Sequence, residues 1–216
     1  MHCKVLSLVI QYVEKFVMNS IKNEDMNLTQ KSKYLIAGLL LLAMILTRGN
    51  ITAHLQDASW AIFFMVGFYL RGASCGRYAF PAFFLLAFVI DLLVIDVVNG
   101  GTHYCFTPSY PFLVPSYFAM WFAGRWFSNH YQESPFGFVK FVTAVVAGTV
   151  TCFLISNIGF YYFAGKFEVM SVAEYAQAVV KYLPGYLKTT GIYLGFIGLV
   201  HLAIVHGRKL ANPEHS

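Results

Sequence analysis

Residues 138–163 read FVKFVTAVVAGTVTCFLISNIGFYYF, a stretch in which Lys140 is the only charged residue. A helix needs about 20 consecutive apolar residues to cross a hydrocarbon core about 30 Å thick, and this stretch is longer. Lipid offers no partner for an unpaired backbone group, so only helices and closed barrels cross a membrane. The stretch lacks the alternation of a barrel strand. It therefore predicts a membrane-spanning helix.

The composition extends this interpretation to the whole chain. Of 216 residues, 58% are hydrophobic and 12% are charged, whereas soluble domains carry about 25% charged residues. Five further apolar runs are separated by Gly, Pro or charged residues, namely residues 33–47, 58–70, 80–98, 112–127 and 182–206. The sequence therefore predicts an all-α integral membrane protein with six transmembrane helices in one domain, residues 33–208.

The positions of Lys and Arg predict how these helices are oriented. With six spans, 11 of the 15 basic residues fall on the side of the two termini and 4 on the other side. Basic residues concentrate in cytoplasmic loops, so both termini are expected in the cytoplasm. The outward connections are then residues 48–57, 99–111 and 164–181. The net charge of +5 reflects this bias and does not indicate nucleic-acid binding.

Both tails lie outside the predicted membrane domain. Residues 1–32 form an N-terminal cytoplasmic extension, in which apolar residues between Val5 and Val17 recur at roughly helical spacing with lysines between them. One interpretation is an amphipathic helix at the membrane surface, and the other is an overextended gene start before Met26. Residues 209–216 form a short cytoplasmic tail.

The outward connection 99–111, NGGTHYCFTPSYP, has no formal charge and is chemically the richest loop. Cys105 is the only cysteine on the predicted outer side, and an unpaired thiol there is prone to oxidation, which indicates shielding or use. A zinc site usually needs three or four ligands, and the outer side offers only His54, His103 and Cys105. A metal already held in an organic ring needs a single axial protein ligand, as cobalt in a corrin does. The alternative is a thiol partly buried among Tyr104 and its aromatic neighbours.

Three stretches carry a resemblance to a known family: DASWAIFFMVGFYLR at 57–71, CFTPSY at 105–110 and AGRW at 123–126. They resemble the BtuM family of cobalamin transporters, which are similar to solitary substrate-binding (S) components of energy-coupling-factor (ECF) transporters. The resemblance implies six helices with cytoplasmic ends in the bacterial inner membrane and uptake of cobalamin, bound between outward loops one, three and five. It also implies that Cys105 is the axial cobalt ligand and helps to remove the cyanide of cyanocobalamin.

Five other residues are candidates for contacting the corrin. Asp91 lies within a predicted span, where a carboxylate is costly and usually faces a cavity. Tyr110 follows Cys105 in the same loop, and its alternative role is an aromatic anchor at the membrane surface. His54 and Asp57 form a polar pair in loop one, where His54 is either a second cobalt ligand or a rim residue. Tyr104 precedes the cysteine directly.

Other functions remain open. Small residues spaced by four would favour docking on a shared membrane partner, but Ala37, Gly38 and Ala43 do not make that repeat, so docking on an ECF module is doubtful. The chain has no Walker A sequence. One rival is an importer of another vitamin, with Cys105 incidental. Another is a membrane thiol-redox enzyme, which ordinarily needs a resolving cysteine.

Overall fold

The computed structural model describes residues 30–48, 56–74, 76–98, 107–165, 167 and 169–211, without the side chains of residues 95–98 and 204–211. Across these residues the chain is helical and contains no strand. The elements are α2 (Gln30–Arg48), α3 (Ser59–Tyr69), α4 (Gly76–Val98), the short 3-10 helix η1 (Tyr110–Phe112), α5 (Leu113–Asn129), α6 (Pro135–Phe163), α7 (Val172–Val180) and α8 (Leu183–Ala211).

Six of these helices coincide with the six predicted apolar runs, and no helix end differs from the predicted end by more than five residues. Three described segments are long and apolar enough to cross a membrane: Gln30–Arg48, Gly76–Val94 and Pro135–Phe163. Helix α3 has 11 residues, which extend about 16 Å at 1.5 Å per residue. It is therefore too short to cross a hydrocarbon core alone.

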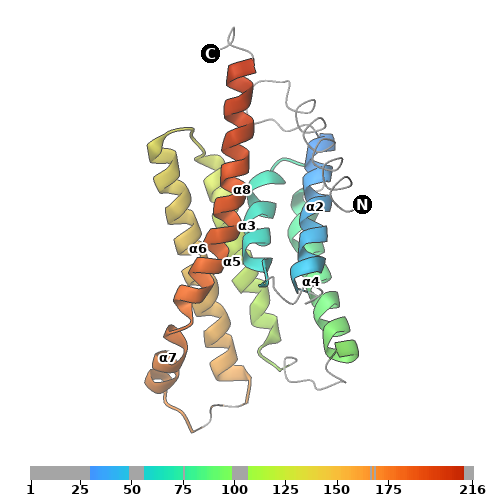
Figure 1. Cartoon of the computed structure of the whole chain (residues 1–216). Coiled ribbons are helices and arrows are strands. Elements are labelled where there is room, and N and C mark those ends of the chain that lie inside the picture. Colours follow the sequence, from blue (N-terminus) through green and yellow to red (C-terminus); the bar gives the residue numbers. More distant parts are fainter. Residues whose placement is uncertain are drawn as a thin grey trace, which may run out of the picture.

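Helices α2, α4 and α6 run in one direction, and α3, α5 and α8 run in the other (Figure 1). Helix α2 begins at the end of the bundle where α8 finishes, and α7 and η1 lie at the other end. We call the end with Arg48, η1 and α7 the η1 end, and the end with Gln30, Asn129 and Ala211 the opposite end. The arrangement places Arg48 and the described parts of all three predicted outward connections at the η1 end.

Helices α3 and α5 make the closest contact in the bundle. A Cβ atom added at Gly67 would lie 2.0 Å from the Trp121 carbonyl oxygen, and one at Gly124 would lie 1.9 Å from the Phe64 carbonyl oxygen. Only glycine lets two backbones approach so closely. Phe63, Phe64 and their apolar neighbours fill the core around this contact, and almost all of α3 is buried.

The outer surface of the bundle is strongly apolar. Large side chains such as Leu85 on α4, Leu154 on α6 and Phe196 on α8 are each more than half exposed. Soluble monomers rarely expose contiguous apolar patches of large area. Together with the three long apolar helices, this surface indicates a membrane protein.

Helix α7 lies within the connection 164–181, where the sequence predicted only a loop. Ser171 accepts a hydrogen bond from the backbone N–H of Glu174, and the Glu174 carboxylate accepts one from the backbone N–H of Ser171. This reciprocal capping box satisfies two otherwise unpaired donors. Tyr175 anchors the helix by donating a hydrogen bond to Asn157 Oδ1 at 3.1 Å.

Candidate functional site

Arg48, the last residue of α2, makes a two-pronged ion pair with Asp91 on α4. Its Nε donates to Asp91 Oδ1 at 2.7 Å and its Nη2 donates to Oδ2 at 2.6 Å. The Arg48 side chain is only 8% exposed, and that of Asp91 is 21% exposed. Parallel hydrogen bonds of this kind are stronger and more directional than neutral ones, so the pair fixes the end of α2 against the last third of α4.

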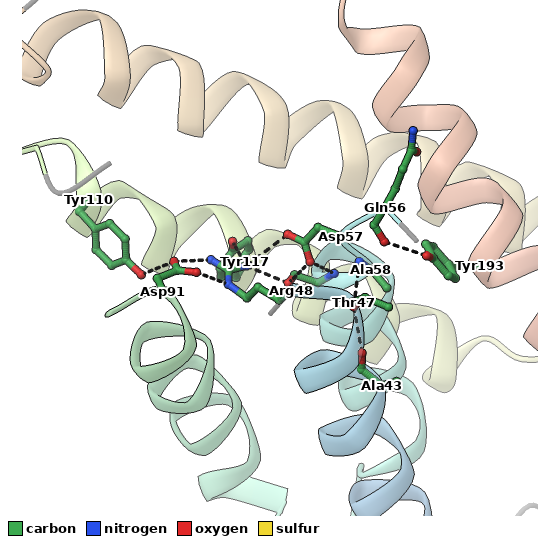
Figure 2. Close-up of polar contacts among 11 residues, drawn as sticks. Ala43, Thr47, Arg48, Gln56, Asp57, Ala58, Asp91, Tyr110, Tyr117 and Tyr193 are labelled. Atoms are coloured by element: carbon green, nitrogen blue, oxygen red, sulfur yellow. Dashed lines mark hydrogen bonds and ion pairs between the residues drawn. The ribbon is translucent and has the colours of Figure 1, made fainter. Parts of the chain in front are cut away.

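The remaining guanidinium nitrogen of Arg48 joins α2 to α3 and α5. Nη1 donates to Ser59 Oγ at 2.8 Å and to the Tyr117 hydroxyl at 2.8 Å, and it lies 3.3 Å from Asp57 Oδ2 (Figure 2). The guanidinium also lies over the Tyr117 ring, 5.5 Å from its centroid. The buried Arg48 side chain at the end of α2 thus contacts α3, α4 and α5.

Tyr110, the first residue of η1, donates a hydrogen bond to Asp91 Oδ2 at 2.7 Å (Figure 2). Its ring packs edge-on against Phe88 of α4, with centroids 5.6 Å apart. Burial, together with the hydrogen bond to the Asp91 carboxylate, raises the pKa of Tyr110 far above its ordinary value. The phenol therefore stays protonated and acts as a donor that ties the end of loop 99–111 to α4.

Local contacts hold the other members of this polar cluster in place. Asp57 Oδ1 accepts hydrogen bonds from the Ser59 backbone N–H at 2.9 Å and the Ser59 hydroxyl at 2.5 Å, next to the start of α3. The Tyr117 ring stacks on Phe63 at 4.6 Å. We call Arg48, Asp57, Ser59, Asp91, Tyr110 and Tyr117 the Arg48 cluster. Two carboxylates share one guanidinium, so the cluster carries one excess negative charge.

Further contacts tie the start of α3 to α8. The Tyr193 hydroxyl donates to the Gln56 carbonyl oxygen at 2.7 Å, and Thr189 donates to the Gln56 side-chain oxygen (Figure 2 shows the former). Trp60 of α3 stacks on Tyr186 of α8, with centroids 4.5 Å apart. These contacts place Tyr186, Thr189 and Tyr193 of α8 beside the start of α3, next to Asp57 of the Arg48 cluster.

Three residues that the sequence nominated as separate candidates lie together in this cluster: Asp57, Asp91 and Tyr110. Loop-one and loop-three side chains therefore converge on one carboxylate–guanidinium centre. Three other candidates lie outside the described residues: Cys105, which the sequence predicted as an axial ligand, Tyr104 and His54.

Sequence reasoning missed Arg48, Ser59 and Tyr117 as members of the site. It counted Arg48 only as one of four basic residues on the outer side. A signal was present, because an arginine at the end of an apolar run and an aspartate inside another are both costly in a membrane and need partners. Pairing these two charges across 43 positions would have predicted the contact.

The described residues do not form a metal site of their own, since no three His, Cys, Asp or Glu side chains among them lie close enough to hold an ion. The one cysteine whose side chain is described, Cys152, is buried in α6. The Arg48 cluster offers a ligand the partly exposed carboxylate of Asp57, whereas Arg48, Ser59 and Tyr110 donate their hydrogen bonds within the cluster. Such a surface suits recognition of a polar ligand more than bond-making chemistry.

No protein-family model matches the chain, and a comparison with curated proteins finds no match.

Proposed function

We propose that the chain is a corrinoid uptake protein of the bacterial inner membrane, in which six spans with cytoplasmic termini carry cobalamin as substrate. The observation that carries this proposal is the convergence of Asp57, Asp91 and Tyr110 on Arg48 at the η1 end. These residues were nominated from separate loops and helices as contacts for one outward-facing ligand. Their meeting supports a single site there.

The directions of the helices support the proposed topology. Helix α2 begins and α8 finishes at the opposite end (Figure 1), as two cytoplasmic termini require. The connections 48–57, 99–111 and 164–181, which carry few basic residues, all begin at the η1 end. The positive-inside rule therefore makes the η1 end the outer one.

Cys105 supplies the axial cobalt ligand in this proposal. It precedes Tyr110 by five positions, so covalent geometry alone keeps the two Cα atoms within about 18 Å of each other. A thiolate is a strong donor to a soft metal. With cyanocobalamin, the thiolate gives an electron pair to cobalt, and cyanide leaves with the pair of the broken cobalt–carbon bond. This exchange involves no net oxidation or reduction.

In this proposal the Arg48 cluster binds amide groups of the corrin and holds loop three in position. Asp57 presents a carboxylate with a side chain that is 47% exposed, and carboxylates accept hydrogen bonds from the amide groups at the rim of a corrin. Asp91 is already paired with Arg48 and Tyr110, so it holds loop three against α4. The rigid centre would thereby fix the loop that carries Cys105.

A growth test separates uptake from mere binding. A bacterial strain that depends on external cobalamin and lacks its own inner-membrane importer should grow at low cobalamin when it produces this chain, and should fail with Cys105→Ala. Cys75→Ala, which removes a thiol on the cytoplasmic side in the proposed topology, serves as control and should support growth. Growth of the Cys105→Ala strain equal to wild type, at matched protein levels, would reject the role of this cysteine. No growth with the wild-type chain would reject cobalamin import.

A further inference from the structure

A cavity of about 850 Å³ lies between α3, α6, α8 and the α5–α6 connection. Small-molecule sites typically have volumes of roughly 300–1,000 Å³, so this one is large enough for a ligand. It is remote from the Arg48 cluster, because its lining residues come from the last turns of α3, the first turns of α6 and the middle of α8. These segments lie toward the opposite end of the bundle (Figure 1).

One end of the cavity is polar. His201 on α8 lies between two tyrosines, with its Nδ1 3.0 Å from the Tyr69 hydroxyl and its Nε2 3.0 Å from the Tyr131 hydroxyl. A neutral imidazole donates through one nitrogen and accepts through the other. The tyrosine that accepts from the imidazole therefore keeps its own hydroxyl hydrogen for another acceptor. Burial raises the pKa of Tyr131 to about 12, so its hydroxyl stays protonated.

The other end of the cavity is apolar and lies deeper in the bundle. It is lined by Phe64 of α3, Phe141 of α6 and Leu194 of α8. These three residues lie farther from the opposite end of the bundle than Tyr69, Tyr131 and His201 do. From Leu194 to His201 the helix advances about 10 Å at 1.5 Å per residue. The lining thus changes from hydroxyl, imidazole, amide and carboxylate groups near the bundle end, Gln132 and Glu133 among them, to hydrocarbon toward its middle.

The cavity opens sideways between α6 and α8. Phe138 and Leu199 belong to its lining and are 64% and 69% exposed. In a membrane, an opening bordered by exposed apolar side chains faces lipid chains. A ligand that enters there has its polar part at the membrane surface and its apolar part directed to the midplane, which is the orientation of a phospholipid.

We propose that this cavity binds one membrane phospholipid, with an acyl chain against Phe64, Phe141 and Leu194 and an ester or phosphate oxygen accepting a hydrogen bond from the Tyr69–His201–Tyr131 triad. The site is separate from the proposed corrinoid site and does not rest on it. Tight lipid binding here would hold α8 against α3 and α6 at the end where α8 leaves the bundle.

Two glycines of α8 provide a matched test. A Cβ atom at Gly198 or at Gly191 meets no other atom within 4 Å, but only Gly198 lines the cavity. Gly198→Phe therefore adds a phenyl ring at the cavity lining with no Cβ clash, and Gly191→Phe places the same ring on α8 outside the cavity. Each methylene displaced from an apolar site weakens binding about fourfold, so Gly198→Phe should weaken binding by at least about tenfold.

The measurement is native mass spectrometry of the delipidated protein titrated with dipalmitoyl phosphatidylglycerol. Glycerol 3-phosphate, the glycerol phosphate part of that lipid without its acyl chains, serves as the control ligand. The wild type and Gly191→Phe should each retain one phospholipid at high collision energy, and Gly198→Phe should lose it. Tyr69→Phe should weaken retention about three- to tenfold, as loss of one hydrogen bond predicts. The proposal would be overturned if Gly198→Phe retained as much lipid as the wild type. It would also be overturned if the protein retained glycerol 3-phosphate as well as the lipid, or bound a protein chain in place of lipid.

Discussion

Arg48→Met is the most informative perturbation of the bundle. It keeps a long, flexible side chain at the end of α2 but removes the donors that reach Asp91, Ser59 and Tyr117. The Asp91 carboxylate would then face the bundle interior without its cation. The change therefore measures how much the Arg48 cluster stabilises the contact among α2, α4 and α5.

The size of the effect follows from burial. Removal of one partner from a buried ion pair costs about 3–5 kcal/mol, because the other charge stays buried. The Asp91 side chain keeps the Tyr110 hydrogen bond and is 21% exposed, so the lower end of that range applies. We expect Arg48→Met to lower the free energy of unfolding by about 3 kcal/mol, which is about 150-fold in the unfolding equilibrium.

The assay is unfolding by sodium dodecyl sulfate in mixed micelles, followed by tryptophan fluorescence. The double variant Arg48→Met, Asp91→Asn removes both charges and keeps an acceptor for Tyr110. Residues in direct contact show interaction energies of about 0.5–3 kcal/mol, so the double variant should be more stable than Arg48→Met alone. The reasoning fails if Arg48→Met costs less than about 1 kcal/mol, or if the losses of the two single variants simply add.

Four further substitutions test the contact between α3 and α5, the helix α2, the Tyr110 contact and the cap of α7. Gly67→Ala would place a Cβ atom 2.0 Å from a carbonyl oxygen of α5, so it should destabilise the fold by about 1–3 kcal/mol in the same assay. Gly38→Ala has open space and should instead stabilise α2 by up to about 1 kcal/mol. Tyr110→Phe removes a hydrogen bond to a carboxylate and should cost about 1.5–3 kcal/mol; a change too small to measure would show that the contact does not stabilise the fold. Ser171→Ala should speed amide exchange in α7 by removing its N-cap, at a cost of about 1 kcal/mol. The Ser171 hydrogen bonds lower the pKa of the Glu174 carboxyl. The ionised carboxylate should therefore stabilise α7 at neutral pH, and this stabilisation should fade as the pH falls through the lowered pKa. Protection of the α7 amides, measured relative to the unstructured chain at each pH, that stays constant as the pH falls would contradict this.

The helices were predictable because a segment that crosses the hydrocarbon core of a membrane must be both apolar and helical. The apolar run at residues 138–163 corresponds to α6, which begins three residues earlier, at Pro135. The short α3 shows the limit of this reasoning. Its apolar run was predicted as a short span, and the described helix has 11 residues, because Leu70 and Gly72 end it at a turn with Gly72 at a φ of 68°. Whether it crosses the membrane within the bundle stays a prediction.

The candidate site was predictable only one residue at a time. Asp91 was nominated because a carboxylate inside an apolar run is costly, and Tyr110 because it follows Cys105. Neither argument names a partner, since the partner Arg48 lies 43 positions from Asp91 and in a different helix. Helix α7 was missed for a different reason, because nine residues of mixed polarity in a connection resemble a loop.

The central claim is that this chain binds a corrinoid through Cys105. The most direct measurement is the visible absorption spectrum of the protein purified after growth with cobalamin, recorded for wild type, Cys105→Ala and Cys75→Ala. The proposal predicts corrinoid absorbance in the wild type, the same spectrum in Cys75→Ala, and a shifted or lost spectrum in Cys105→Ala. No corrinoid absorbance in the wild type, or an unchanged spectrum in Cys105→Ala, would contradict it.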